Sequence, residues 1–132
     1  MLSWNVQGLY NKLSDNSFRT FLCDFDIVCV LETWLRKELL DTVNLAGFAA
    51  FHTCRDRVAR KGRYAGGVTV FIRQALTKGV TLLSTDLSDS IFLKLDCNVF
   101  GMSKNIIIGS IYIPPSGSTC YVSEENGIEL LE

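Results

Sequence analysis

Four landmarks in the sequence place a polar side chain or a glycine pair at the end of a strand-like apolar run. They are Trp4-Asn5-Val6-Gln7-Gly8-Leu9, Leu31-Glu32-Thr33-Trp34, Gly66-Gly67-Val68 and Ile111-Tyr112-Ile113-Pro114-Pro115. Strand ends are where α/β folds gather their ligands. Glu32 is the most informative because it directly follows the apolar run 27–31, where a carboxylate must find a partner or bind a cation. The landmarks therefore indicate a candidate site at strand ends.

Each landmark also has a purely structural interpretation. Asn5 could satisfy its own turn, and Glu32 could cap a helix that begins near Trp34 or pair with an arginine. Tyr112 beside two prolines could serve packing alone. Gly66-Gly67 by itself indicates a backbone turn or a close approach. It is the occurrence of all four in one chain that favours a functional site.

The composition is that of one globular domain. The 132 residues are 48% hydrophobic and 20% charged, and 13 Lys and Arg against 14 Asp and Glu give a net charge of −1. These values exclude intrinsic disorder and a supercharged nucleic-acid tail. No transmembrane run or secretion signal is recognisable, and the five cysteines are scattered without a Cys-x-x-Cys pair. We therefore expect reduced thiols in an intracellular protein that is neither secreted nor membrane-bound.

The hydrophobic pattern predicts the elements that must position the landmarks. We expect strands over 2–6, 27–31, 48–52, 66–73, 80–84, 91–97 and 105–113. A short helix capped by Ser14 or Asp15 should follow the first strand, and a second helix should span 35–45. This order predicts a mixed sheet with helices on one face. Because 27–31 and 106–113 are apolar on both faces, the other face of the sheet would be uncovered and open to self-association.

In this order, the four landmarks resemble the endonuclease/exonuclease/phosphatase superfamily. The resemblance is greatest to the apurinic-type endonuclease domain of non-LTR retrotransposon polyproteins, which also encode reverse transcriptase. It covers residues 2–118 and leaves 119–132 as an acidic tail. The resemblance implies an α/β (α+β) layered sandwich, with this chain as the N-terminal half of a two-sheet, four-layer fold.

The resemblance also implies roles for three residues. Asn5 matches the asparagine that helps to hold the phosphate, and Glu32 matches the glutamate that binds Mg²⁺ or Mn²⁺. Tyr112 matches the tyrosine whose hydroxyl group faces the scissile phosphate, where a donor stabilises developing charge. A metal with few protein ligands keeps positions for water and a phosphate oxygen. Gln7 departs from relatives that carry aspartate, which weakens the expected support of the metal.

Two further motifs of the family are absent from the sequence. Gly-Asp-x-Asn supplies the aspartate that activates water, and Ser-Asp-His supplies a metal-site aspartate and the catalytic histidine; the single histidine, His52, does not match. We therefore expect an N-terminal fragment of a Mg²⁺-dependent DNA endonuclease of a retrotransposon, nuclear in location and inactive alone. The alternatives are a decayed mobile-element remnant with at most weak nucleic-acid binding, and an unrelated protein-interaction module.

A basic segment lies between the second and third landmarks. Within nine residues it holds five cations opposed only by Asp56, namely Arg55, Arg57, Arg60, Lys61 and Arg63. These residues could contact DNA phosphates, or they could form a solvated charged loop.

Overall fold

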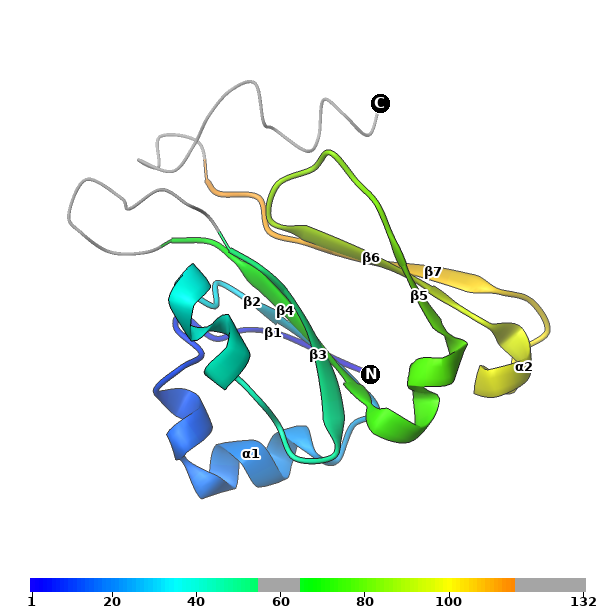
Figure 1. The fold of residues 1–132 in the computed structure, drawn as a ribbon, viewed down its shortest axis with the longest axis horizontal. Helices are drawn as coiled ribbons and strands as arrows, with labels where there is room; N and C mark the ends of the chain where they lie inside the picture. The colour runs from blue at the N-terminus through cyan, green and yellow to red at the C-terminus, as the bar shows by residue number, and fades with distance from the viewer. Residues whose placement is uncertain (55–64, 116–132) are drawn as a thin grey trace.

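Two β-sheets pack face to face in the computed structural model of the chain, which describes residues 1–54 and 65–115 (Figure 1). The first sheet has the strand order β1-β2-β4-β3, and the second has the order β5-β6-β7. The strands are β1 (Leu2–Asn5), β2 (Ile27–Leu31), β3 (Phe48–Thr53), β4 (Val68–Arg73), β5 (Val80–Leu83), β6 (Ser90–Leu95) and β7 (Ile106–Ile111). The layered α/β class with two sheets is confirmed, whereas the single mixed sheet predicted from element order is wrong.

Alternating side chains give the first sheet two buried faces. β1 runs parallel to β2, and the other neighbours in this sheet are antiparallel. In β2, Val28 and Val30 belong to the core under the helical side, while Ile27 and Cys29 belong to the core shared with the second sheet. The predicted strand over 27–31 is confirmed, and its central position explains why it is apolar on both faces.

The helix α1 (Asn16–Leu22) begins where a carboxylate caps it. The side chain of Asp15 accepts hydrogen bonds from the backbone N–H groups of Ser17 at 2.8 Å and Phe18 at 3.4 Å. Asp15 therefore fills the capping role for which the sequence offered either Ser14 or Asp15. The remaining helical turns are η1 (Lys12–Ser14), η2 (Lys37–Thr42), η3 (Gln74–Gly79) and α2 (Cys97–Phe100).

The α-helix predicted over 35–45 is wrong. Only the 3-10 helix η2 forms there, with extended backbone at Arg36 before it and at Val43 after it. Leu35, Val43 and Leu45 are all buried, and they reach the core from the extended segments rather than from a helical face. Burial of these side chains has overridden the helical spacing of the sequence.

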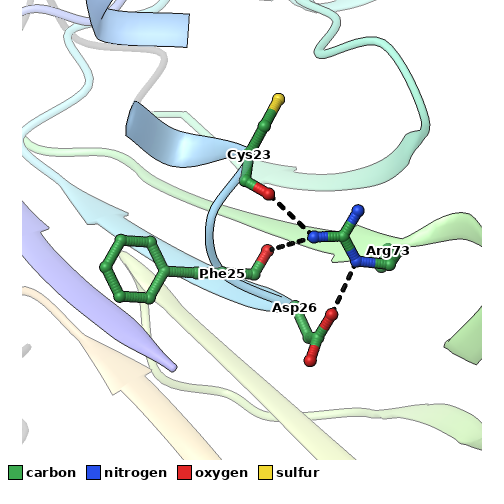
Figure 2. Close-up of polar contacts among 4 residues, drawn as sticks. All are labelled: Cys23, Phe25, Asp26 and Arg73. Atoms are coloured by element: carbon green, nitrogen blue, oxygen red, sulfur yellow. Dashed lines mark hydrogen bonds and ion pairs between the residues drawn. The ribbon is translucent and has the colours of Figure 1, made fainter. Parts of the chain in front are cut away.

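Arg73, at the end of β4, forms hydrogen bonds to the turn that leads from α1 into β2 (Figure 2). Its guanidinium group donates from Nη2 to the carbonyl oxygens of Cys23 at 2.8 Å and Phe25 at 3.3 Å, and from Nε to Asp26 Oδ1 at 2.6 Å. The same group lies 5.0 Å from the centre of the Phe48 ring. One planar cation thus joins a loop to two strands, which suits the fixed fork of donors in arginine.

The second sheet covers the first sheet with one face and leaves its other face open. Leu93, Leu95 and Ile108 lie in the shared core. On the opposite face, the register aligns Leu83 with Phe92 and Gly109, and Ile107 with Lys94, and Ile107 is 62% exposed. The uncovered apolar face therefore belongs to the second sheet, among the described residues, and not to the first sheet as predicted, because the second sheet itself supplies the missing cover.

Three other expectations concern parts of the chain away from the sheets. Cys23, Cys29 and Cys97 are thiols, as predicted, although Cys97 opens α2 instead of lying in a strand. Among the described residues, the longest α-helix has seven residues, so none of these helices can cross a bilayer. The predicted acidic tail, 119–132, lies outside the described residues.

Candidate functional site

The first three landmarks meet at one edge of the first sheet. In the strand register, Asn5 is opposite Leu31, and Leu31 is opposite Val68. Since β1 and β2 end at this edge while the antiparallel β4 begins there, Asn5, Glu32 and the Gly66-Gly67 pair become neighbours. The structure thus brings together residues that are separated by more than 60 positions in the sequence.

A chain of backbone hydrogen bonds connects these turns. The N–H groups of Gly8 and Leu9 donate to the carbonyl oxygens of Glu32 at 2.8 Å and Thr33 at 2.9 Å. The N–H groups of Thr33 and Trp34 donate in turn to the carbonyl oxygens of Gly67 at 3.2 Å and Gly66 at 3.1 Å. The turn after β1, the turn after β2 and the glycine pair therefore form one hydrogen-bonded unit.

Asp89 links this unit to Tyr112 across the two sheets. Its Oδ1 accepts a hydrogen bond from the Gly67 N–H at 3.0 Å, and its backbone carbonyl accepts one from the Tyr112 N–H at 3.0 Å. Asp89 is 3% exposed and precedes β6 directly. Sequence reasoning missed this residue, because an aspartate between two strand-like runs carries the ordinary signal of a turn.

Three residues of the site have left-handed backbone conformations that side chains other than glycine rarely adopt. The φ angles are +49° at Gln7, +53° at Glu32 and +53° at Trp34. Each such conformation costs on the order of 1–2 kcal/mol and persists only where the surrounding structure imposes it. Strain of this kind clusters at functional sites, and it has no signal in the sequence.

Asn5 and Lys12 define the polar surroundings of the turn after β1. The Gln7 N–H donates to Asn5 Oδ1 at 3.3 Å, so Asn5 makes the local turn contact that its structural interpretation predicts. The ammonium group of Lys12 donates to the carbonyl oxygens of Val6 and Gln7. Lys12 is a second residue that sequence reasoning missed, and it places a positive charge at the turn after β1.

Trp34 packs on this turn through Gly8. A Cβ atom at Gly8 would lie 3.1 Å from Cε3 of the Trp34 ring, and Gly8 has a φ of +98°. Trp34 itself is 38% exposed. The indole ring is therefore a partly exposed reporter group two residues from Glu32.

The site supplies a side-chain oxygen ligand of the kind that a hard divalent cation prefers, but few such ligands. Glu32 offers a carboxylate, which is a ligand type that Mg²⁺ accepts. The described ranges 1–54 and 65–115 contain no group of three or more His, Cys, Asp or Glu side chains that could hold a metal. Mg²⁺ often keeps several waters and one or two carboxylates, so Glu32 fits as a single protein ligand of an open site.

Neither the buried thiol nor the histidine lies in the hydrogen-bonded turns of the site, although His52 directly precedes Thr53, which is opposite Val68. Burial raises the pKa of Cys29, and the hydroxyl group of Ser110 opposes part of that shift. Burial also lowers the pKa of His52, partly opposed by the carboxylate of Asp41, while its Nδ1 is 2.9 Å from Thr69 Oγ1. A thiol with a raised pKa is a poor nucleophile, and His52 is held inside the first sheet, as expected for a histidine outside the family motif.

The remaining sequence-predicted residues divide between the core and the undescribed region. Tyr112 is partly buried and packs against the core between the sheets. The five cations of the basic segment, 55–63, lie outside the described residues. The residues that flank them are at the site edge, since Thr53 is opposite Val68 and Gly66 accepts from Trp34.

Comparison with protein families matches residues 2–122 to the Endonuclease/Exonuclease/phosphatase family. The chain belongs to this family. The match spans all four landmarks, which explains why they occur in this order. No curated protein sequence matches the chain significantly.

A solved structure supports the same fold for this family member. The chain is similar to the AP endonuclease LMAP from Leishmania major, with 21% sequence identity and a TM-score of 0.63. The similarity covers 87% of this chain and 40% of the Leishmania chain. The chain therefore spans less than half the length of the solved endonuclease.

Proposed function

We propose that this chain carries the N-terminal part of a nuclease site that acts on DNA phosphodiester bonds with Mg²⁺ or Mn²⁺. The observation that supports this most directly is the meeting of Asn5, Glu32 and Gly66-Gly67 at one sheet edge, with Glu32 in a left-handed conformation. Strain at a polar residue next to a buried strand is unusual where only packing is needed.

Each residue of this site has a proposed role. Glu32 binds the metal, which when bound would polarise a phosphate oxygen and lower the pKa of a coordinated water. Asn5 donates from its amide group to a phosphate oxygen while its Oδ1 accepts from Gln7. The hydroxyl group of Tyr112 donates to the scissile phosphate, where negative charge develops.

Metal binding by Glu32 can be measured without catalysis. In a Trp4→Phe background, Trp34 is the only tryptophan, and Mn²⁺ should quench its fluorescence because the ring lies two residues from Glu32. Glu32→Gln should weaken this quenching at least about tenfold in Mn²⁺ concentration, because a charged ligand is lost. Glu38→Gln, on η2, is the matched control. Equal quenching in Glu32→Gln and its parent would refute the metal role.

The proposed enzyme is inactive in this form. The sequence has neither Gly-Asp-x-Asn nor Ser-Asp-His, and loss of a general acid or base lowers the rate by about 10²–10⁴ for each group. Supercoiled plasmid incubated with the chain and Mg²⁺ should therefore remain intact. Nicking that disappears in Glu32→Gln would mean that another residue activates water.

The basic segment is proposed as the DNA-contacting part. The described residues that flank it, Thr53 and Gly66, lie at the same edge as Glu32. If three to five of its cations contact phosphates, log K should fall against log salt with a slope of roughly −3 to −4.5. Alanine at Arg57, Arg60 and Arg63 should flatten the slope by about one unit per lost contact, equally on unrelated sequences. An unchanged slope would favour a solvated loop.

A retrotransposon is the proposed source, and the nucleus the proposed location. The order of the landmarks resembles the endonuclease domains of such elements. The chain could derive from an active parent enzyme or from a decayed remnant of the element, and the genomic sequence beyond the codon for Glu132 distinguishes these two origins. Codons for Gly-Asp-x-Asn and Ser-Asp-His in frame would indicate an active parent enzyme, and stop codons would indicate a decayed remnant.

Self-association is proposed through the outer face of the second sheet, defined by Leu83, Phe92, Ile107 and Ile111. No helix or strand within 1–54 and 65–115 covers this face (Figure 1). Ile107→Thr should reduce the apparent size in gel filtration and the binding of a hydrophobic dye. Ile106→Thr is the matched control, since Ile106 is opposite the inward-facing Leu95. A parent protein that is a monodisperse monomer with a cooperative melt would contradict the proposal.

A further inference from the structure

We propose that Asp89 is a positioning residue that fixes Tyr112 relative to the turn containing Glu32. The functional importance of the spacing between Tyr112 and Glu32 rests on the proposed function. The hydrogen bonds through Asp89 that set this spacing do not. Asp89 accepts one hydrogen bond from Gly67, which precedes β4 of the first sheet, and another from Tyr112, which follows β7 of the second sheet.

The two bonds use different parts of Asp89. The carboxylate accepts from Gly67 N–H at 3.0 Å in the protein interior, and the backbone carbonyl accepts from Tyr112 N–H at 3.0 Å. Burial strengthens a hydrogen bond to a carboxylate oxygen, because the local dielectric constant is low. A change in the side chain of Asp89 should therefore act on Gly67 while the bond to Tyr112 is retained.

The bond to Gly67 reaches the turn containing Glu32 through one more step. Gly67 accepts from Thr33 N–H and Gly66 accepts from Trp34 N–H, so the position of the glycine pair determines that of the turn. The apolar core between the sheets also holds them together, but apolar contacts are not directional. Hydrogen bonds between defined atoms add a directional constraint to this packing.

The conformation of Asp89 supports the same interpretation. Its φ is +48°, in the left-handed region where glycine is the least strained residue. If only a turn were needed at this position, glycine would serve better. The loop is also anchored independently, because Ser90 Oγ donates to the Leu87 carbonyl at 2.8 Å. The carboxylate therefore has a use beyond closing the loop between β5 and β6.

Two substitutions distinguish the effect of the backbone conformation of Asp89 from the effect of its carboxylate. Asp89→Gly retains the favourable backbone and removes the acceptor, and Asp89→Asn retains an uncharged acceptor on a residue that tolerates positive φ. Asp96→Asn, at the other end of β6, is the matched control, because Asp96 caps α2 through a bond to Asn98 N–H at 2.8 Å.

Amide hydrogen exchange measured by NMR on the whole chain tests the proposal. In Asp89→Gly, exchange at Gly67 should accelerate at least about tenfold, with shifted amide resonances at Thr33 and Trp34, while Tyr112 stays protected. Asp89→Asn should restore the resonances of Thr33 and Trp34 and leave Gly67 about 3–10 times faster than the parent. Asp96→Asn should change none of these signals.

The outcomes that would overturn the proposal are equally specific. Unchanged exchange at Gly67 in Asp89→Gly, or equal loss of protection at Gly67 and Tyr112, would mean that the carboxylate does not position the glycine pair. If Asp89→Gly does not fold, the rate at Gly67 in Asp89→Asn decides the question alone. A failure of Mn²⁺ to quench Trp34 would refute the metal role of Glu32 and leave these exchange results to stand independently.

Discussion

The hydroxyl oxygen of Thr33 lies 2.5 Å from the point that a Cβ atom on Gly67 would occupy. The Thr53 carbonyl oxygen lies 3.2 Å from the same point. Only glycine therefore allows the turn after β2 and the start of β4 to approach closely enough for the hydrogen bond between Thr33 N–H and Gly67.

Gly67→Ala should destabilise the protein by about 2–4 kcal/mol, from the backbone conformation together with the steric overlap. Gly47→Ala is the matched control, because Gly47 has almost the same φ, +82° against +84°, and nothing within 4 Å of the added atom. Gly47→Ala should cost only about 1 kcal/mol. Urea denaturation of the two variants measures the difference, and equal destabilisation would mean that Thr33 moves aside freely.

The two fully buried threonines should respond in opposite ways to valine. Thr33 Oγ1 has no hydrogen-bond partner among the described residues, whereas Thr69 Oγ1 is 2.9 Å from His52 Nδ1. Thr33→Val should therefore be neutral or stabilising, because it removes a buried polar group without a partner. Thr69→Val should cost about 1–3 kcal/mol, because it leaves His52 without that bond. Thermal melting of both variants at one pH tests the pair, and a destabilised Thr33→Val would indicate a partner for its hydroxyl group.

Substitutions at Arg73 and Asp26 should distinguish the stability contributed by their exposed ion pair from that contributed by the two hydrogen bonds of Arg73 to backbone carbonyl oxygens. Asp26→Asn should cost only about 0.2–1 kcal/mol, because the side chains of Arg73 and Asp26 are 39% and 65% exposed. Arg73→Met should cost about 1.5–3 kcal/mol, because the carbonyl oxygens of Cys23 and Phe25 lose their donor. The free energy of unfolding in urea distinguishes them, and equal values would assign the stabilisation to the ion pair.

The strands could be predicted from the sequence because their signals are local. Each predicted strand occurs within two residues of its expected ends; β4 begins at Val68 because Gly66 and Gly67 have left-handed conformations. The helix over 35–45 failed because the burial of Leu35 and Val43 depends on neighbours distant in sequence. The position of the second sheet also depends on tertiary contacts, which element order does not contain.

The site was predictable in its landmarks but not in the contacts that connect them. Asn5, Glu32 and Gly66-Gly67 could be found because each interrupts an apolar run at its end. Asp89 and Lys12 could not, since their importance comes from acceptors and donors supplied by other turns. The left-handed conformation of Glu32 is equally invisible in the sequence, because glutamate has no preference for it.

The stability of the protein should decrease as the pH falls below about 6.5, through His52. Burial lowers the pKa of His52 below its ordinary value of 6.5, so the unfolded chain binds a proton at a higher pH than the folded chain does. Stability is therefore greatest above 6.5 and is lost as the pH falls from 6.5 toward the lower pKa of the folded state. A single group cannot give a slope steeper than about 1.4 kcal/mol per pH unit.

Urea denaturation between about pH 7.5 and 5.5 measures this dependence, because most carboxylates titrate below that range. His52 is the only histidine, so His52→Gln should make the stability almost constant across the range. Asp41→Asn should instead make the loss steeper, since the Asp41 carboxylate raises the pKa of His52 and partly offsets the effect of burial. A parent protein whose stability is constant over the range, or a His52→Gln variant with the parent's slope, would contradict the buried neutral state of His52. That result would also question the bond between His52 and Thr69, which the fold places under the helical side of the first sheet.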